Sequence, residues 1–260
     1  MGDLEFKVTS GVGTITLNRP EKKNAFTLEM IDEWAGILTR ARTDPAIRVM
    51  VVTGAGQAFC SGIDLGGMAA GTMSPLAQRR RLTDRIQRVA LAAEDLDKPL
   101  IAAVNGVAVG AGLDMALMCD IRFAAASARM SEGYIRVGLV PGDGGCYFLP
   151  RLVGMGKALE LLMSGDFVDA AEAHRIGLVN RVFDDESLIE ETYAFAERLA
   201  ALPPVSLGLI RRATYQSARS DLRTALDLVA SHVAVVTSTR DTQEALNAFR
   251  DRRPADFSGD

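Results

Sequence analysis

Residues 100–114 have the sequence LIAAVNGVAVGAGLD, in which a short apolar run leads into a glycine-rich turn. The apolar run, Leu100–Val104, is typical of a buried β-strand. The glycines that follow permit positive φ angles and let other atoms approach the backbone closely. Because a helix is expected to begin near Ala111, the order of strand, turn and helix indicates an α/β fold.

Another turn of this kind lies earlier in the chain and is the first of the two in sequence order. Residues 49–53 form a short apolar run suited to a buried strand, and residues 54–65, GAGQAFCSGIDL, then turn the chain. Backbone N–H groups in the first turn of a helix have no partner within it, so they can bind an oxygen that gains negative charge in a reaction. Glycine-rich turns are also common as purely structural features, and the turns alone leave both interpretations open.

The rest of the chain places strands in the first 150 residues and helices in the last hundred. Residues 66–78 are rich in Gly, Ala, Met and Ser, which is typical of a mobile loop, whereas 157–253 is almost wholly helical apart from a break at 202–204. The last helices are too few to form a large core alone, so we expect them to pack on the first part or on another subunit. The other predicted elements are two strands within 6–17, helices from Thr27, over 79–96 and over 113–119, and a strand at 121–124.

Composition excludes several classes of partner. The chain has 260 residues, of which 48% are hydrophobic and 24% charged, enough for one sizeable core. Its net charge of −4 and pI of about 5.4 lack the basic excess expected for binding to nucleic acid or to an anionic membrane. No apolar run approaches the ~18 residues of a membrane-spanning helix, and the first residues, MGDLE, do not resemble a secretory signal.

The cysteines and histidines exclude several kinds of site. Cys60, Cys119 and Cys146 are widely spaced and odd in number, which argues against a disulfide framework and for a reducing cytoplasm. With only His174 and His232, the chain cannot form a His-rich metal site, and a Ser-His-Asp triad has few candidates. We therefore expect no metal centre.

Ten short motifs, in one order along the chain, resemble those of the crotonase superfamily, the enoyl-CoA hydratase/isomerase family. The resemblance implies an α/β fold, a crotonase-like spiral of ββα units, with the core and acyl-CoA site in residues 1–200 and a helical C-terminal trimerisation region in 201–260. It also implies a trimer or a dimer of trimers, an acyl-CoA thioester substrate, and no cofactor beyond the coenzyme A of the substrate itself. The motifs lie at residues 15–20, 23–26, 58–64, 99–106, 110–114, 119–122, 138–145, 149–154, 173–180 and 248–254.

In this family two backbone N–H groups hold the thioester oxygen, and the matching positions are Ile63 and Ala111. The resemblance therefore agrees with the independent interpretation of the two turns. Removing a proton beside a thioester, or adding a nucleophile at its β-carbon, creates an enolate. Losing one preorganised donor to such an oxyanion raises the barrier by roughly 3–4 kcal/mol.

The resemblance also suggests the groups that move protons. Family hydratases carry an acid four residues after the glycine that matches Gly110, which is Asp114 here, but the position of their second glutamate holds Tyr134. Tyrosine, with a pKa near 10, is a poor base at neutral pH, although it can donate a hydrogen bond. Asp143, in a glycine-rich loop, and Glu132 are nearby acids that could replace it. We rank the four candidates Asp114, Asp143, Tyr134 and Glu132.

Coenzyme A is expected to approach the backbone near Ala25. For each basic residue considered as a phosphate ligand, the alternative is an ordinary solvated surface residue with no role in binding. Met68 and Met73, in the 66–78 segment, are expected to shape the acyl pocket, since flexible methionines fit varied chains. The basic candidates for the phosphates are Arg19, Lys22, Lys23 and, near the C-terminus and from the same or a neighbouring subunit, Arg252 and Arg253.

These expectations favour an enoyl-CoA hydratase, acting on 2-enoyl-CoA as in fatty-acid or amino-acid breakdown. Replacement of the second glutamate by Tyr134 keeps an enoyl-CoA isomerase, or another crotonase-type reaction, as the alternative. A non-catalytic CoA-ester binder is a hypothesis of a different class. RNA binding is disfavoured by the acidic balance of charge.

Overall fold

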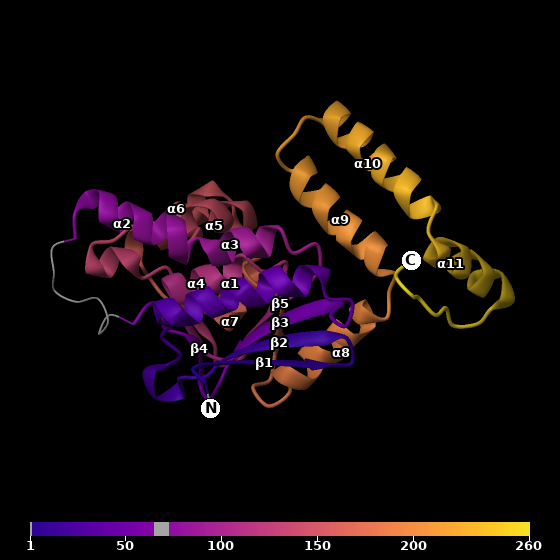
Figure 1. The fold of residues 1–260 in the computed structure, drawn as a ribbon. Coiled ribbons are helices and arrows are strands. Elements are labelled where there is room, and N and C mark those ends of the chain that lie inside the picture. Colours follow the sequence, from indigo (N-terminus) through magenta and orange to yellow (C-terminus); the bar gives the residue numbers. More distant parts are fainter. Residues whose placement is uncertain (1, 65–72) are drawn as a thin grey trace.

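The computed structural model describes residues 2–64 and 73–260. Two β-sheets form the centre of the molecule, helices cover them, and the last helices lie to one side (Figure 1). The strands are β1 (Leu4–Thr9), β2 (Val12–Leu17), β3 (Val49–Gly54), β4 (Ala58–Cys60), β5 (Leu100–Val104), β6 (Val107–Val109), β7 (Ile121–Ala125), β8 (Arg129–Ser131), β9 (Val168–Asp169) and β10 (Arg181–Phe183). The α-helices are α1 (Leu28–Thr43), α2 (Pro75–Arg81), α3 (Arg88–Glu94), α4 (Ala111–Leu117), α5 (Gly145–Val153), α6 (Met155–Ser164), α7 (Ala170–Arg175), α8 (Leu188–Ala200), α9 (Pro204–Ser217), α10 (Leu222–Thr237) and α11 (Arg240–Asp251).

The chain repeats a ββα unit three times. In each unit the first strand joins a six-stranded sheet of order β1-β2-β3-β5-β7-β10, and the second joins a four-stranded sheet of order β4-β6-β8-β9. A helix follows each strand pair, so β3-β4, β5-β6 and β7-β8 lead towards α2, α4 and α5. Strands β3, β5 and β7 are parallel, as are β4, β6 and β8. The predicted spiral of ββα units is present.

The larger sheet is buried between helices. Four of the six residues of β3 and all five residues of β5 are apolar and inaccessible to solvent. Helix α8 packs across these strands, and α1 lies on the other side of the sheet (Figure 1). Strands buried on both faces have continuous rather than alternating apolar residues, which is the pattern seen in the sequence. Helix α1 begins as predicted after Thr27, whose hydroxyl accepts the Met30 N–H at 3.3 Å.

The structure corrects two predicted boundaries. Most of the 66–78 segment, with Met68, lies outside the described residues, but its end is helical, since α2 begins at Pro75 rather than at Arg79. Ser74 caps this helix, and proline at the first position costs no hydrogen bond. The almost wholly helical region after residue 157 also contains two short strands, β9 and β10, which extend the two sheets.

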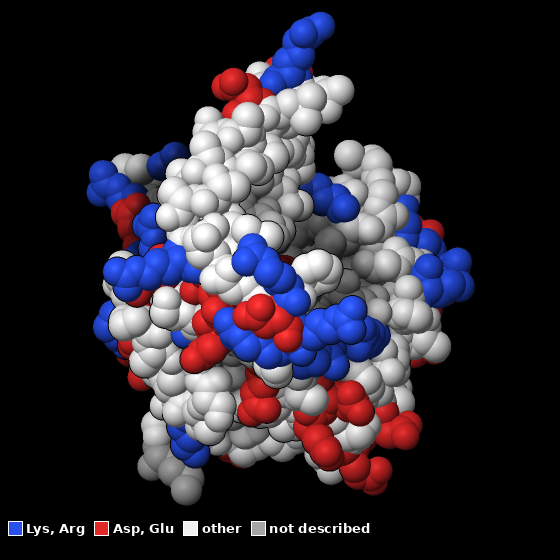
Figure 2. Space-filling view, turned by 90° about the vertical axis from the view of Figure 1, so that its right-hand side faces the viewer, with Lys and Arg blue, Asp and Glu red and all other residues white. Residues whose placement is uncertain are grey.

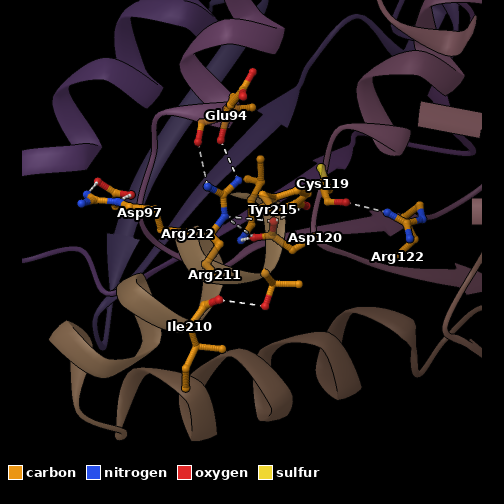
Figure 3. A network of polar contacts seen from close by, with 12 residues as sticks. Glu94, Asp97, Cys119, Asp120, Arg122, Ile210, Arg211, Arg212 and Tyr215 are labelled. Carbon is orange, nitrogen blue, oxygen red and sulfur yellow. Dashed lines mark hydrogen bonds and ion pairs between the residues drawn. The ribbon is translucent and has the colours of Figure 1, made fainter. Parts of the chain in front are cut away.

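A buried ion pair holds α9 against the core (Figure 3). Arg211 Nε donates to both carboxylate oxygens of Asp120, each at 2.9 Å, and its other nitrogens donate to two backbone carbonyls at the end of α3. The Tyr215 hydroxyl donates to Asp120 Oδ1 at 2.7 Å, and Asp120 Oδ2 also accepts the N–H of Leu100. Since Leu100 begins β5, this network ties the C-terminal helices to the strand that leads into the second glycine-rich turn.

Helix α10 lies beyond α9 and has no buried residue. Leu222, Leu226, Val229 and Val233 follow one another along one of its faces and are all exposed. Figure 2 looks towards this end of the molecule and shows a mostly uncharged surface between a few charged side chains at the top and many across the middle. Among the described residues, no helix is both long enough and apolar enough to span a membrane.

Candidate active site

The three parallel strands of the smaller sheet end at one edge, and the candidate residues follow those ends. Ile63 comes after β4, Ala111 comes after β6, and Tyr134 comes after β8. Because β4, β6 and β8 run in the same direction side by side, positions far apart in the sequence are brought together. The two glycine-rich turns and the acidic candidates therefore belong to one site.

The two turns touch through glycine. Gly62 has φ +96°, and a Cβ at this position would lie 3.1 Å from the Val109 carbonyl oxygen and 3.6 Å from the Ala111 nitrogen. A side chain would therefore both strain the backbone and separate the turns. Within the described residues, neither Ile63 N–H nor Ala111 N–H donates to a backbone carbonyl. The turn that carries the Ile63 N–H thus packs against the one that carries the Ala111 N–H, and neither N–H is used by a backbone carbonyl in the described residues.

Asp114 lies in the first turn of α4, a helix whose seven residues are all buried. The carboxyl group is fully inaccessible and Oδ1 has no hydrogen-bond partner among the described residues. Burial raises the pKa of Asp114 to about 7, and the Tyr134 hydroxyl, which favours the charged form, opposes this increase. A carboxyl that titrates near neutral pH can both accept and return a proton.

The Tyr134 hydroxyl lies between two carboxyl groups, 2.6 Å from Asp114 Oδ2 and 2.9 Å from Asp143 Oδ2. The hydroxyl has one proton and can donate to only one of the two carboxyls. The other contact is a hydrogen bond when that carboxyl is protonated and donates to the tyrosine oxygen. Burial raises the pKa of Asp143, and burial and both carboxyls raise the pKa of Tyr134 far above its usual range. Tyr134 is therefore a hydrogen-bond donor rather than a base, and the two aspartates share protons across it.

Glu132 lies on the other side of Asp114. A Cβ added to Gly145 would come 2.5 Å from Asp114 Oδ1 and 2.8 Å from Glu132 Oε2, so both carboxyls crowd the same backbone atom. Only glycine leaves them room. The structure brings all four acidic or hydroxyl candidates together, with Asp114 in the middle, Tyr134 and Asp143 on one side and Glu132 on the other.

Cavities adjoin this cluster. One of about 360 Å³ lies beside Asp143, and Leu91, Tyr147 and Phe148 form part of its wall. Another of about 300 Å³ adjoins Ile63. The sequence motifs do not single out Tyr147 and Phe148, although two adjacent aromatic residues one position after the glycine-rich loop of Asp143 are a signal that could identify them.

The turn expected to approach coenzyme A packs directly on the first glycine turn. The Lys23 carbonyl accepts the Ser61 N–H at 3.0 Å, and Phe26 and Ile63 form a parallel bridge. Lys22 and Lys23 are exposed and, within the described part of the chain, have no ionic partner. The Arg19 guanidinium is mostly buried and is engaged inside the protein, so its contact with a phosphate stays a prediction. It donates to the Ala25 carbonyl and to Asp64, and thereby fixes the turn.

Two candidates lie far from this cluster within one chain. Arg252 and Arg253 follow α11, at the opposite end of the molecule from β4 (Figure 1). The Arg253 guanidinium forms a two-pronged pair with Glu244 at 2.6 and 2.8 Å. Their contribution to a site would have to be made to a neighbouring subunit. Met73 is exposed, and its part in an acyl pocket stays a prediction.

Residues 7–260 match the sequence model of one protein family, enoyl-CoA hydratase/isomerase. The chain belongs to this family. A 1,2-epoxyphenylacetyl-CoA isomerase of Escherichia coli is 37% identical over 97% of both chains, and a crotonyl-CoA hydratase of Syntrophomonas wolfei is 34% identical over 95% of this chain and 94% of its own. The crystal structure of an enoyl-CoA hydratase from Bacillus anthracis is 34% identical, with a TM-score of 0.94 over 100% of both chains.

Membership of the enoyl-CoA hydratase/isomerase family confirms two expectations. The structural match confirms the crotonase-like α/β fold with its C-terminal helices. The sequence matches make the chain an enzyme of a family that acts on acyl-CoA thioesters, with lyase or isomerase activity.

Proposed function

We propose that this enzyme reversibly hydrates 2-enoyl-CoA thioesters, through an enolate whose oxygen is held by the Ile63 and Ala111 amides. The observation that carries the proposal is the Tyr134 hydroxyl between Asp114 and Asp143. Two carboxyls that share protons supply a base and an acid at neutral pH. Hydration needs both, because water loses a proton as it attacks the β-carbon and the α-carbon gains one.

The amides account for the largest part of the expected rate increase. They come from the turns that follow β4 and β6, and donors held in place by such turns need no reorganisation when the thioester oxygen becomes negative. The proposal needs no metal or redox cofactor, since the amides stabilise charge and the carboxyls move protons. Lys22 and Lys23, exposed beside the Ile63 turn, are the proposed partners of coenzyme A phosphates. Three free cysteines support a reducing, cytoplasmic location.

The proposed assembly is a trimer or a dimer of trimers. The exposed apolar face of α10 supports it, since an isolated chain would leave Leu222, Leu226 and Val233 in water. In such an assembly Arg252 and Arg253 could serve a neighbouring subunit.

The direct test uses crotonyl-CoA and follows loss of the absorbance of the conjugated thioester. Reaction in water enriched in oxygen-18 is expected to place the label on the β-carbon of the product. Asp114→Asn and Asp143→Asn are expected to lower kcat by about 100-fold or more, because each removes one member of the acid and base pair. Absence of label in the product would exclude hydration.

Double-bond isomerisation is the second candidate, and Tyr134 is the observation that favours it. This residue stands where the family resemblance places the second hydratase glutamate, and isomerisation needs only one carboxyl to carry a proton between carbons. A 3-enoyl-CoA substrate would then be converted to the conjugated 2-enoyl form, without uptake of oxygen from water.

A CoA-ester binder without activity is the remaining class. It would bind butyryl-CoA as tightly in Asp114→Asn as in the wild type and turn over neither substrate. Isothermal titration with butyryl-CoA, together with the two activity assays, separates this case from both enzymes.

A further inference from the structure

Glu132 is a buried acid that the proposed mechanism does not use. It follows β8 directly, its side chain is 1% exposed, and neither carboxyl oxygen has a hydrogen-bond partner within the described residues. Burial of an unpartnered carboxylate is among the most costly arrangements in a protein. The Glu132 carboxyl is therefore either protonated, and so neutral, or it shares a proton with a neighbouring group.

Glu132 lies next to Asp114, one of whose carboxyl oxygens also lacks a hydrogen-bond partner among the described residues. Oδ2 of Asp114 contacts Tyr134, whereas Oδ1 is buried and unpartnered. Oδ1 and both oxygens of Glu132 are the three atoms nearest to a Cβ built on Gly145, at 2.5, 2.8 and 3.1 Å. Three buried, unpartnered oxygens thus surround a single point, and a proton on one carboxyl would satisfy the other.

The surroundings determine which carboxyl holds that proton. The titratable groups that face Glu132 are Asp114 from α4, Asp143 from the loop before α5, and Cys146 from α5, with Tyr134 beyond Asp114. All are acids, and among the described residues no Lys or Arg forms an ion pair with Glu132. Burial and the nearby Asp114 raise the pKa of Glu132 to about 10, well above that of Asp114. The proton therefore belongs to Glu132.

We propose that Glu132 is a positioning residue, which stays protonated throughout the reaction and donates its carboxyl proton to Asp114 Oδ1. Tyr134 donates to Oδ2, so both oxygens of Asp114 are held and the carboxylate has one orientation. This inference rests on the proposed role of Asp114 as a catalytic residue. The bond also favours the charged form of Asp114 and keeps its titration near neutral pH.

Two substitutions at the same position test this role. Glutamine has the shape of a protonated glutamate and donates an N–H but cannot titrate, so Glu132→Gln is expected to keep kcat/KM within about threefold and leave its pH profile in place. Leucine has a similar size and no donor, so Glu132→Leu is expected to lower kcat by about 10-fold and to shift the acidic limb of the profile to higher pH. A purely structural role would not move the profile.

Two results would overturn the inference. A loss of about 100-fold or more in Glu132→Gln would mean that the carboxyl itself exchanges a proton in the reaction. An unchanged pH profile in an active, folded Glu132→Leu would mean that Asp114 does not depend on this donor.

A measurement without substrate separates this inference from the proposed function. At about pH 8.5, between the pKa of Asp114 and that of Glu132, the infrared spectrum of the wild type is expected to contain the C=O stretch of a protonated carboxylic acid. The same band should be missing in Glu132→Gln. A difference spectrum with no such band refutes the protonated state even if crotonyl-CoA is hydrated, and its presence supports that state even if crotonyl-CoA is not a substrate.

Discussion

At the scale of single residues, the raised pKa that suits Asp114 to proton transfer also lowers the free energy of unfolding above about pH 4. Burial raises its pKa to about 7 from an ordinary 3.8. Between these values the folded protein keeps a proton that the unfolded chain has released, so the free energy of unfolding falls as the pH rises from about 4 to about 7. Asp114→Asn removes this titration and is expected to be more stable than the wild type at pH 8 by roughly 1–3 kcal/mol. Urea denaturation at pH 8 and at pH 4.5 checks this, and an equal difference at both would contradict it.

Tyr134→Phe removes only the hydroxyl between the two aspartates. Its hydrogen bonds lower the pKa of Asp114 and of Asp143, so the variant is expected to shift the acidic limb of the kcat/KM profile to higher pH. Loss of a hydrogen bond to a charged group is worth about 1.5–3 kcal/mol, which corresponds to a 10- to 100-fold lower rate at pH 7. The measurement is a pH series with crotonyl-CoA. An unchanged rate together with an unmoved limb would show that Tyr134 acts only by filling space.

The sequence predicted some of these residues and not their arrangement. Ile63, Ala111 and Asp114 are predicted from the resemblance of their short glycine motifs to those of the family. Tyr134 was expected to donate a hydrogen bond, but its position between two carboxyls depends on partners 20 and 9 residues away. Arg19 is predicted to bind phosphate, and the local sequence does not reveal its ion pair with Asp64, which lies 45 residues away.

At the scale of elements, long apolar strands were easier to predict than short ones. The strands β3 and β5 were recognised because both faces are buried and every residue is apolar. By contrast, β4, β6 and β8 each have three residues, too few for a periodic pattern, yet they form the sheet that carries the site. Their pairing depends on the larger sheet and on glycines that allow close approach.

Gly112 tests this dependence, because it presses α4 against β4. A Cβ at Gly112 would lie 2.2 Å from the Cys60 carbonyl oxygen, and backbone cannot move aside cheaply. Gly112→Ala is therefore expected to displace the Ala111 amide and lower kcat by about 100-fold or more. Gly156→Ala is the matched control, since no atom lies within 4 Å of its Cβ position in α6. Thermal unfolding should report a loss of stability for the first variant alone, and equal activities would refute the argument.

At the scale of the whole molecule, the spiral places the site in the core and leaves the C-terminal helices at its side. The Arg211–Asp120 pair fixes α9 to the start of β5, so α10, which packs on α9, is held in a defined position although none of its residues is fully buried. The sequence predicted packing of these helices on the core or on another subunit. The structure contains the first contact, and the apolar face that α10 leaves in water supports the proposal of the second.

A charged side chain on the exposed apolar face of α10 should prevent assembly. Val233→Arg places a guanidinium among Leu226 and Val229, where a subunit interface would have to bury it unpaired, and such burial costs several kcal/mol. We expect light scattering with size-exclusion chromatography to give a mass near three or six times 27.8 kDa for the wild type and near 27.8 kDa for this variant. Ser231→Arg adds the same charge to an exposed position on the opposite side of α10 and is expected to keep the wild-type mass. A wild type that is already monomeric, or two variants that dissociate alike, would show that this face is not the interface.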